Sequence, residues 1–282
     1  MSKLLLVLFF LSSSLFAEQS PIEFFTYGGI LKYNNSKKLR GDVKGIYIMG
    51  FDSPLKAELG AEHTRIVRDG AKTIKQSDYT LLLNFFRGSH NGYKIGVHPI
   101  ATNDDLTKNG IVYIVGANYY QIGKYELKGN IYYSHYSNLK TSPRVLQVSP
   151  EFGFAYGSFY AKKPAFYVSI KADYIHPTKN REENDLKEKY FSMSFKVINH
   201  SGKFTTVFDK WYGRRAMVVE NDGFTVVNAT DEETGGFLIS ESYQYKKNQN
   251  FKISYSYLTF KEKDEDRVSN RNTFLIGYLY DF

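Results

Sequence analysis

Two side chains near the middle of the chain have the types and spacing that hydrolytic chemistry needs. His135 and Ser137 lie two residues apart in the segment His135-Tyr136-Ser137-Asn138. In an extended strand, residues two apart face the same side. An imidazole beside a hydroxyl group can act as a general base and make that hydroxyl a nucleophile. The pattern therefore defines one hypothesis, the hydrolysis of an ester by His135 and Ser137.

The same segment resembles the His-x-Ser-Asn element of outer-membrane lipid A deacylases and, more loosely, of outer-membrane phospholipase A. The resemblance implies that His135 is the general base and Ser137 the nucleophile, both facing lipid at the outer leaflet. The sequence departs from both families. Leu139-Lys140-Thr141 follows where deacylases carry small residues and an acid that orients the histidine, and the Gly that phospholipases carry after the Asn is missing. A lipid esterase or deacylase is therefore the alternative hypothesis and not the main one.

A larger set of charged residues alternates with apolar residues along extended segments. Lys94 and His98, for example, alternate with Tyr93, Ile95 and Val97. A charge that faces lipid at the bilayer midplane costs about 2 to 4 kcal/mol, so in a membrane barrel these charges should point into an aqueous lumen. The residues predicted to line the lumen are Lys56, Glu58, Glu62, Lys94, His98, Glu126, Lys128, Lys171, Asp173, Lys196 and Asp209.

These faces need strands to position them, and the chain shows helix periodicity nowhere for long. Alternation and turn residues predict about fourteen strands, with twelve or sixteen as alternatives. The expected strands are 22–33, 42–51, 54–67, 77–88, 92–101, 110–121, 124–136, 143–157, 164–176, 188–199, 203–213, 235–246, 250–260 and 271–282. Glu241 shares a face with apolar neighbours, which predicts either a bulge at Gly235-Gly236 or a position near a membrane interface.

The connections alternate between short and long, as periplasmic turns and extracellular loops do in outer-membrane barrels. Short ones are expected at 52–54, 90–92, 122–124, 161–163, 200–202 and 247–249, and long ones at 37–41, 68–77, 102–109, 138–142, 177–187, 213–234 and 261–270. The loop at 213–234 is long enough to fold into the mouth of the barrel. A hairpin of 217–220 with 224–228 inside this loop is the basis of the sixteen-strand alternative.

The last strand is apolar on one face up to the terminal carboxylate. Phe274, Ile276, Tyr278, Tyr280 and Phe282 share that face. The pattern resembles the closing strand of bacterial outer-membrane β-barrels, which commonly end on an aromatic residue that the assembly machinery reads. The resemblance implies an all-β transmembrane antiparallel up-and-down barrel in the outer membrane, with Tyr278, Tyr280 and Phe282 as an assembly signal.

The start of the chain reads as a secretory signal peptide at residues 1–17, which leaves residues 18–282 as a single barrel domain. Cysteine is absent, so disulfides do not stabilise the fold. The net charge is +8, but the charges are interspersed along strands and not clustered, which argues against nucleic-acid binding. The His residues show no metal-ligand spacing, and we expect no metal and no cofactor.

A barrel of this size with a polar, mixed-charge lumen resembles the small monomeric porins. The resemblance implies passive diffusion of small polar solutes. A slight cationic excess in the predicted lining would favour anions modestly if these charges surround an open path. The expected partners are outer-membrane lipid, lipopolysaccharide, the barrel-assembly machinery and small polar solutes. Two alternatives stay open: the lipid esterase or deacylase described above, and a structural or surface-recognition barrel without transport.

Overall fold

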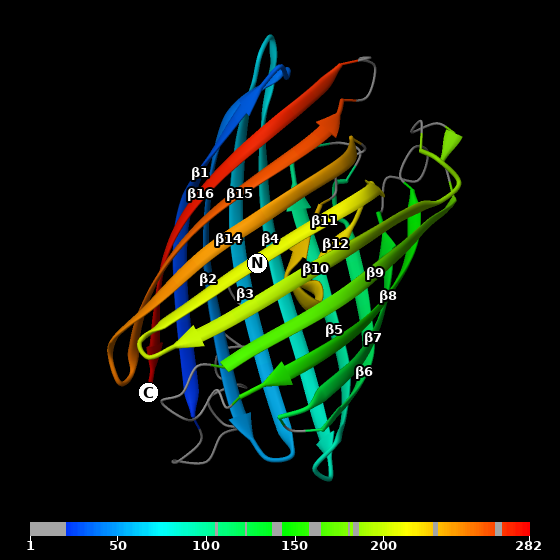
Figure 1. The fold of residues 1–282 in the computed structure, drawn as a ribbon. Coiled ribbons are helices and arrows are strands. Elements are labelled where there is room, and N and C mark those ends of the chain that lie inside the picture. Colours follow the sequence, from blue (N-terminus) through cyan, green and yellow to red (C-terminus); the bar gives the residue numbers. More distant parts are fainter. Residues whose placement is uncertain are drawn as a thin grey trace, which may run out of the picture.

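The computed structural model describes residues 21–104, 107–121, 123–136, 143–157, 165–179, 181–182, 186–227, 231–262 and 267–282. Fourteen strands form the wall of a closed barrel (Figure 1). They are β1 (Ile22–Asn34), β2 (Lys38–Asp52), β3 (Leu55–Arg68), β4 (Ala71–Arg87), β5 (Asn91–Thr102), β6 (Ile111–Gln121), β7 (Tyr125–His135), β8 (Arg144–Tyr156), β9 (Ala165–Lys179), β10 (Tyr190–Ser201), β11 (Phe204–Arg215), β14 (Glu232–Lys246), β15 (Gln249–Lys261) and β16 (Val268–Asp281). Two short strands, β12 (Val219–Glu220) and β13 (Thr225–Val226), flank a single helical turn, η2 (Asn221–Gly223).

Each wall strand pairs antiparallel with its neighbours in the barrel order, and β1 closes the barrel against β16 from Glu23↔Asp281 to Asn34↔Asn270. The predicted fold class and strand number are therefore confirmed. We call the end of the barrel with the turns at Gly88 and Gly202 the tight-turn end, and the opposite end, from which the connection between β11 and β14 leaves, the loop end; Gly88 and Gly202 have positive φ values of 66° and 61°. Glycine adopts this conformation without steric cost, so the sequence can reverse direction there within a few residues.

Several predicted loops are shorter in the structure. β2 and β4 begin at Lys38 and Ala71, so the loops expected at 37–41 and 68–77 are tight turns between longer strands. The ladder between β3 and β4 continues through Arg65↔Lys75 and Ile66↔Ile74. Outward-facing polar residues such as Arg65 and Lys75 are compatible with a strand at this position, because this part of β3 and β4 lies beyond the apolar belt of the outer wall.

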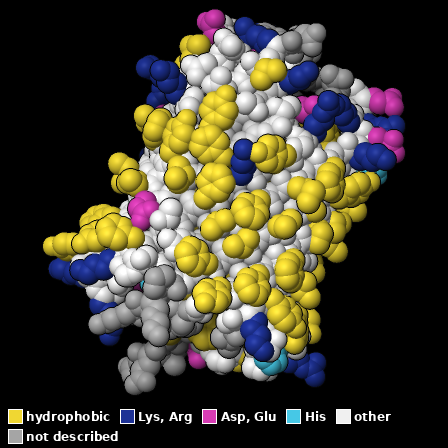
Figure 2. All heavy atoms as spheres, viewed as in Figure 1, with side chains coloured by type: hydrophobic (Ala, Val, Ile, Leu, Met, Phe, Trp, Pro, Cys, Tyr) yellow, Lys and Arg dark blue, Asp and Glu magenta, His cyan; other side chains and the backbone are white. Residues whose placement is uncertain are grey.

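The outer wall carries the apolar faces that the alternation predicts. Ile95, Phe152, Ile253 and Ile276 are each at least half exposed. Figure 2 shows apolar side chains spread over one side of the wall, with most charged side chains toward its two ends. Within the described ranges, the structure contains no helix that is long and apolar enough to cross a membrane.

Candidate functional site

A short hairpin folds inward from the connection between β11 and β14 and occupies part of the lumen. We call residues 216–227 the inserted hairpin; they contain β12, η2 and β13. Its strands pair only with each other, through Val219↔Val226 and Glu220↔Thr225. The hairpin foreseen in the 213–234 loop is thus present, but its two-residue strands are far too short to span a bilayer, so the sixteen-strand alternative is wrong.

One side of the inserted hairpin is apolar and is buried against the wall. Ala216, Met217 and Val218 have no exposed surface. The wall residues of the same cluster come from β4 to β10 and include Leu82, Val112, Ile114, Tyr132, Val145 and Ile175. This contact explains why the segment at 111–121 is apolar on both faces in the sequence: one face meets lipid and the other meets the hairpin.

Gln147 in β8 holds the inserted hairpin by its backbone. Its side-chain amide donates to the carbonyl oxygen of Val219 over 2.9 Å and accepts from the amide N–H of Val219 over 2.8 Å. Gln147 is 1% exposed. It thereby bonds to the edge of β12 that does not pair with β13, and it satisfies two backbone groups that would otherwise be buried without partners.

The tip of the inserted hairpin is held by charge. Asp222 Oδ1 lies 2.8 Å from Lys94 Nζ and accepts a hydrogen bond from Asn130 Nδ2 at 3.1 Å. The loss of bulk water inside the barrel would by itself raise the pKa of the Asp222 carboxyl group, but the Lys94 and Lys128 ammonium groups lower its pKa to about 2. Asp222 is therefore ionised at neutral pH and binds the tip to β5 and β7.

Arg215 anchors the base of the inserted hairpin. Its guanidinium pairs with Glu220 at 2.6 Å and with Glu233 at 2.7 Å, and it stacks 3.6 Å from the ring centre of Trp211. Arg215 and Glu233 are both buried, so the pairing compensates the desolvation of the two charges. The hairpin thus has three separate attachments to the wall.

Three cavities follow one another past the inserted hairpin. The outer cavity, of about 320 Å³, lies toward the loop end; the middle cavity is about 210 Å³ and the inner cavity about 330 Å³. The outer and middle cavities share Glu220, Leu258 and Arg271 in their linings. The middle and inner cavities share a second set, namely Lys128, Asn130 and Asp222.

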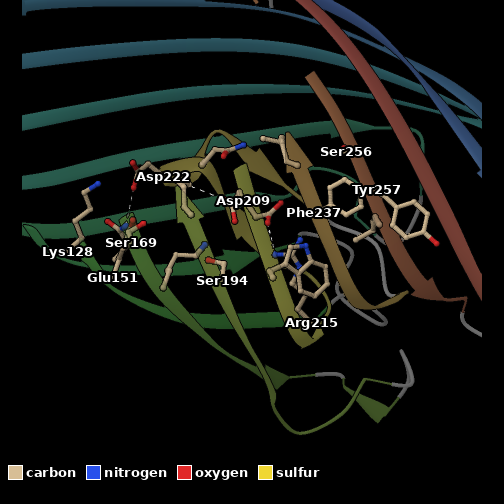
Figure 3. Close-up of a pocket in the computed structure, with 18 of the residues that line it drawn as sticks. Lys128, Glu151, Ser169, Ser194, Asp209, Arg215, Asp222, Phe237, Ser256 and Tyr257 are labelled. Atoms are coloured by element: carbon tan, nitrogen blue, oxygen red, sulfur yellow. Dashed lines mark hydrogen bonds and ion pairs between the residues drawn. The ribbon is translucent and has the colours of Figure 1, made fainter. Parts of the chain in front are cut away.

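The middle cavity is strongly charged. Figure 3 shows Lys128, Glu151, Asp209 and Arg215 around it, together with Asp222 from the inserted hairpin. The outer cavity differs, because one side of its wall is apolar and carries Leu31, Tyr33, Val43, Leu258 and Phe260. The expectation of a polar interior is thus too simple for the outer half of the lumen.

The predicted lumen residues fall into separate groups. Lys56, Glu58, Lys94 and Glu126 line the inner cavity; Lys171, Lys196 and Asp209 line the middle one; Lys128 lines both of these, and Glu62 lines the outer one. His98 and Asp173 face inward but are 0% and 1% exposed. His98 bonds to Thr80 at 2.8 Å, and Asp173 accepts from Ser149 at 2.7 Å.

The sequence interpretation missed Gln147, Arg215, Glu220, Glu233 and Arg271. Strand alternation points Gln147 and Arg271 inward, but it does not show what they meet there. The turn sequence Asn221-Asp222-Gly223 between two short apolar runs was the available signal for the hairpin, and it carries no information about where the hairpin packs.

Some charges face outward, contrary to the general assignment of strand charges to the lumen. Lys210 shares a face with the exposed Phe208, and its ammonium lies 4.7 Å from the ring centre of Tyr212. Glu241 shares a face with Ile239 and accepts from Thr206 at 2.7 Å. The ladder does shift, between Glu233 and Gly235, yet Glu241 still faces outward, opposite Ile253 of β15.

The hydrolytic pair is only partly described. His135 ends β7 and shares the outward phase of Ile131 and Tyr133, whereas Ser137 lies outside the described residues. In the ranges that the structure covers, no hydrogen bond or ion pair joins His135 to a carboxylate, and no group of three or more His, Asp or Glu side chains could hold a metal ion.

The three aromatic residues of the proposed assembly signal lie at the tight-turn end of β16. The rings of Tyr280 and Phe282 are 4.7 Å apart, and Tyr278 packs 5.3 Å from Phe251. The amide of Phe282 donates to the carbonyl oxygen of Ile22 over 2.9 Å, so the last residue is part of the closure between β16 and β1. Phe282 is 77% exposed on the outer wall.

A closed fourteen-strand barrel with an apolar outer wall and a charged lumen is the fold of bacterial outer-membrane β-barrels. Solved structures with this fold agree. The chain is similar to a bacterial polysaccharide outer membrane secretin (TM-score 0.58, 9% identity, covering 93% of this chain and 98% of that one). It is also similar to the CymD monoaromatic hydrocarbon channel (TM-score 0.57, 6% identity, 94% and 89% covered) and to a Pseudomonas aeruginosa FadL homologue (TM-score 0.53, 9% identity, 93% and 90% covered). No family model and no curated protein matches the sequence.

Proposed function

We propose that the protein is an outer-membrane channel for the passive diffusion of small polar solutes, narrowed by the inserted hairpin. The observation that carries this proposal is the row of three cavities, in which neighbours share lining residues. A structural barrel would have no need for connected cavities along its length. One protein of similar fold is a monoaromatic hydrocarbon channel, so barrels of this kind can conduct; the solute class proposed here comes from the lumen of this chain.

The sizes of the cavities restrict the solute. Volumes of about 210 to 330 Å³ lie at or below the lower end of those that hold small ligands. The inserted hairpin is attached through Gln147, Asp222 and Arg215, so it narrows the path in the resting structure. We therefore expect small conductance steps in the wild-type protein and exclusion of larger solutes.

The charges of the middle cavity favour anions, because cationic side chains outnumber carboxylates in its lining. The carboxylates of the outer cavity have partners: Tyr27 and Thr64 donate to Glu62, and Lys38 pairs with Asp231. Arg271, at the junction with the middle cavity, has a buried Nε with no hydrogen-bond partner in the described chain. Glu220 near it is already bound by Arg215. A cation without a full set of partners beside a narrow path attracts anionic solutes.

Single-channel recording of the purified, refolded protein in planar bilayers tests the proposal. We expect discrete small openings from the wild type and much larger ones when residues 217–226 are replaced by a short Gly-Ser linker. The chain lacks cysteine, so an Asn130→Cys/Asp222→Cys variant can be joined specifically by a short thiol cross-linker. This variant fixes the inserted hairpin to the wall, whereas the linker variant removes it. Cross-linking should keep the conductance small. Silence from both the wild type and the linker variant, with folding verified by circular dichroism, would refute the channel.

A further inference from the structure

A cluster of basic residues faces outward near the loop end of β2 to β4. We call Lys44, His63, Arg65, Lys72 and Lys75 the outer basic patch; with Asp42, Thr73 and Asn103 they line one shallow groove. Lys44 and His63 alternate with the inward-facing Val43 and Glu62, which places the patch on the outer wall and not in the lumen. It belongs to neither the cavities nor the inserted hairpin.

The strand register aligns the outer basic patch in cross-strand rows. Lys44 lies opposite His63, which lies opposite Ser77; one row farther out, Asp42 lies opposite Arg65, which lies opposite Lys75. The next row farther out pairs Lys32 with Arg40, and both are exposed. Successive outward rows are about 6 to 7 Å apart along a strand, so these cations form a continuous surface.

The level of the patch is set by the apolar wall beneath it. The row directly before Lys44 and His63 consists of Ile46, Ala61 and Tyr79, and the rows before that continue with apolar residues such as Ile48, Leu59 and Leu81. An aromatic residue such as Tyr79 at the edge of an apolar belt is typical of a membrane interface. The patch therefore begins where the acyl chains end, on the side of the loops, which is the outer leaflet.

The charge of the patch is largely uncompensated by the protein. Among the described residues, no carboxylate lies within ion-pair distance of Lys44, Arg65, Lys72 or Lys75, all of which are exposed. Asp42 is the one carboxylate that lines the groove. The outer wall is not basic everywhere, because on β6 to β8 an outward row holds Tyr113, Tyr133 and Leu146.

We propose that the outer basic patch binds the phosphate groups of a phosphorylated glycolipid of the outer leaflet, the lipid A part of lipopolysaccharide. Arg and Lys are the side chains that bind phosphate oxygens with charge-assisted hydrogen bonds. The apolar rows below the patch match the acyl chains of the same molecule, so one amphiphile satisfies both surfaces. This inference does not depend on whether the lumen conducts.

Binding of purified lipid A to the refolded full chain, measured by native mass spectrometry in detergent, tests the proposal. We compare the wild type with Lys44→Gln/Arg65→Gln/Lys75→Gln and with a control of equal charge change on other strands and loops, Arg144→Gln/Lys189→Gln/Lys261→Gln. The patch variant should lose at least about tenfold in affinity, the free-energy scale of one charge-assisted contact, and the control should not. Equal binding by the wild type and the patch variant would overturn the proposal.

A second arm needs only the wild-type protein and so does not depend on whether a variant folds. Bisphosphorylated lipid A should bind more tightly than the monophosphorylated form, and dephosphorylated lipid A should bind weakest. Added salt should reduce these differences, because exposed charges are screened. If the dephosphorylated lipid binds as well as the bisphosphorylated one, the acyl chains alone hold the lipid and the patch is not a phosphate site. Free inorganic phosphate that competes at equal concentration would point to a soluble anion in place of a lipid.

Discussion

Asp222 at the tip of the inserted hairpin and Lys94 in β5 form an ion pair, with 2.8 Å between Oδ1 and Nζ. The two residues come from separate parts of the barrel, because the hairpin leaves the wall between β11 and β14, while β5 lies between β4 and β6. The contact bridges the lumen at the point where the middle and inner cavities meet. It therefore couples the position of the hairpin to the width of the proposed path.

Removing the charge of Asp222 should loosen the tip of the inserted hairpin. The Asp222 side chain is 47% exposed, so we expect Asp222→Asn to weaken its attachment by at most about 1 kcal/mol, or about fivefold in the balance between seated and released hairpin. Single-channel recordings should show more frequent large openings. Asp52→Asn, at the end of β2, makes a matched charge change outside the cavities and should leave the recordings unchanged.

The pH dependence of the same contact follows from the lowered pKa of Asp222. Its pKa is about 2, below the ordinary value of 3.8, so the attraction to Lys94 is complete above about pH 4 and is lost as the pH falls through 2. Conductance should stay constant from pH 8 to pH 4 and rise in stronger acid. The Asp222→Asn variant should lack the acid-induced rise. An opening that begins near pH 6 in the wild type would assign the attachment to another group.

Replacing Gln147 by Ala should release the backbone of the inserted hairpin. Two buried backbone groups of Val219 lose their partner, at a cost of about 1 to 3 kcal/mol. Met217, which has no exposed surface in the hairpin, should then be oxidised faster by peroxide, as mass spectrometry of its peptide can show. Met193, 47% exposed on the outer wall, serves as the internal reference. Gln244→Ala, near a tight turn, should leave the oxidation of Met217 at the wild-type rate.

A side chain at position 60 should push the hairpin away from the wall. A Cβ atom on Gly60 would lie 2.8 Å from Cδ1 of Phe224, which is closer than such atoms approach in proteins. Gly60→Val should therefore shift Phe224 and increase the conductance. Gly129→Val makes the same change where nothing lies within 4 Å, and its conductance should match the wild type. Equal behaviour of the two variants would show that Phe224 does not restrict the path.

Neutralising Arg271 should reduce the preference for anions. Arg271 lines both the outer and the middle cavity, so Arg271→Gln removes a positive charge directly from the path. The reversal potential in a salt gradient should move toward that of a non-selective channel. Lys210→Gln removes the same charge from the outer wall and should leave the reversal potential where it is. If both variants shift it equally, selectivity arises from the overall charge and not from Arg271.

The wall of the barrel could be predicted because each strand carries its own pattern. Tyr93, Ile95 and Val97 alternate with Lys94 in the sequence. This alternation is enough to assign the two faces of the strand, because one face contacts lipid and the other does not. The number of strands and the direction of these faces follow from such local signals. The sequence analysis did not predict the outward Lys210 or the outer basic patch. It assumed that every charged side chain of a strand points away from the outer wall. Charges beyond the apolar rows, or extended along an aromatic ring, do not carry the midplane cost.

The antiparallel barrel follows from local patterns in the sequence, since period-two alternation and turn residues act between near neighbours along the chain. The contents of the barrel depend instead on contacts between distant parts of the folded chain. The inserted hairpin is held by Lys94, Gln147 and Ile114, which belong to strands far from it in sequence, and no local pattern encodes such contacts. The same holds for the row formed by Asp42, Arg65 and Lys75, because three separate strands must be placed in register before their charges form one surface.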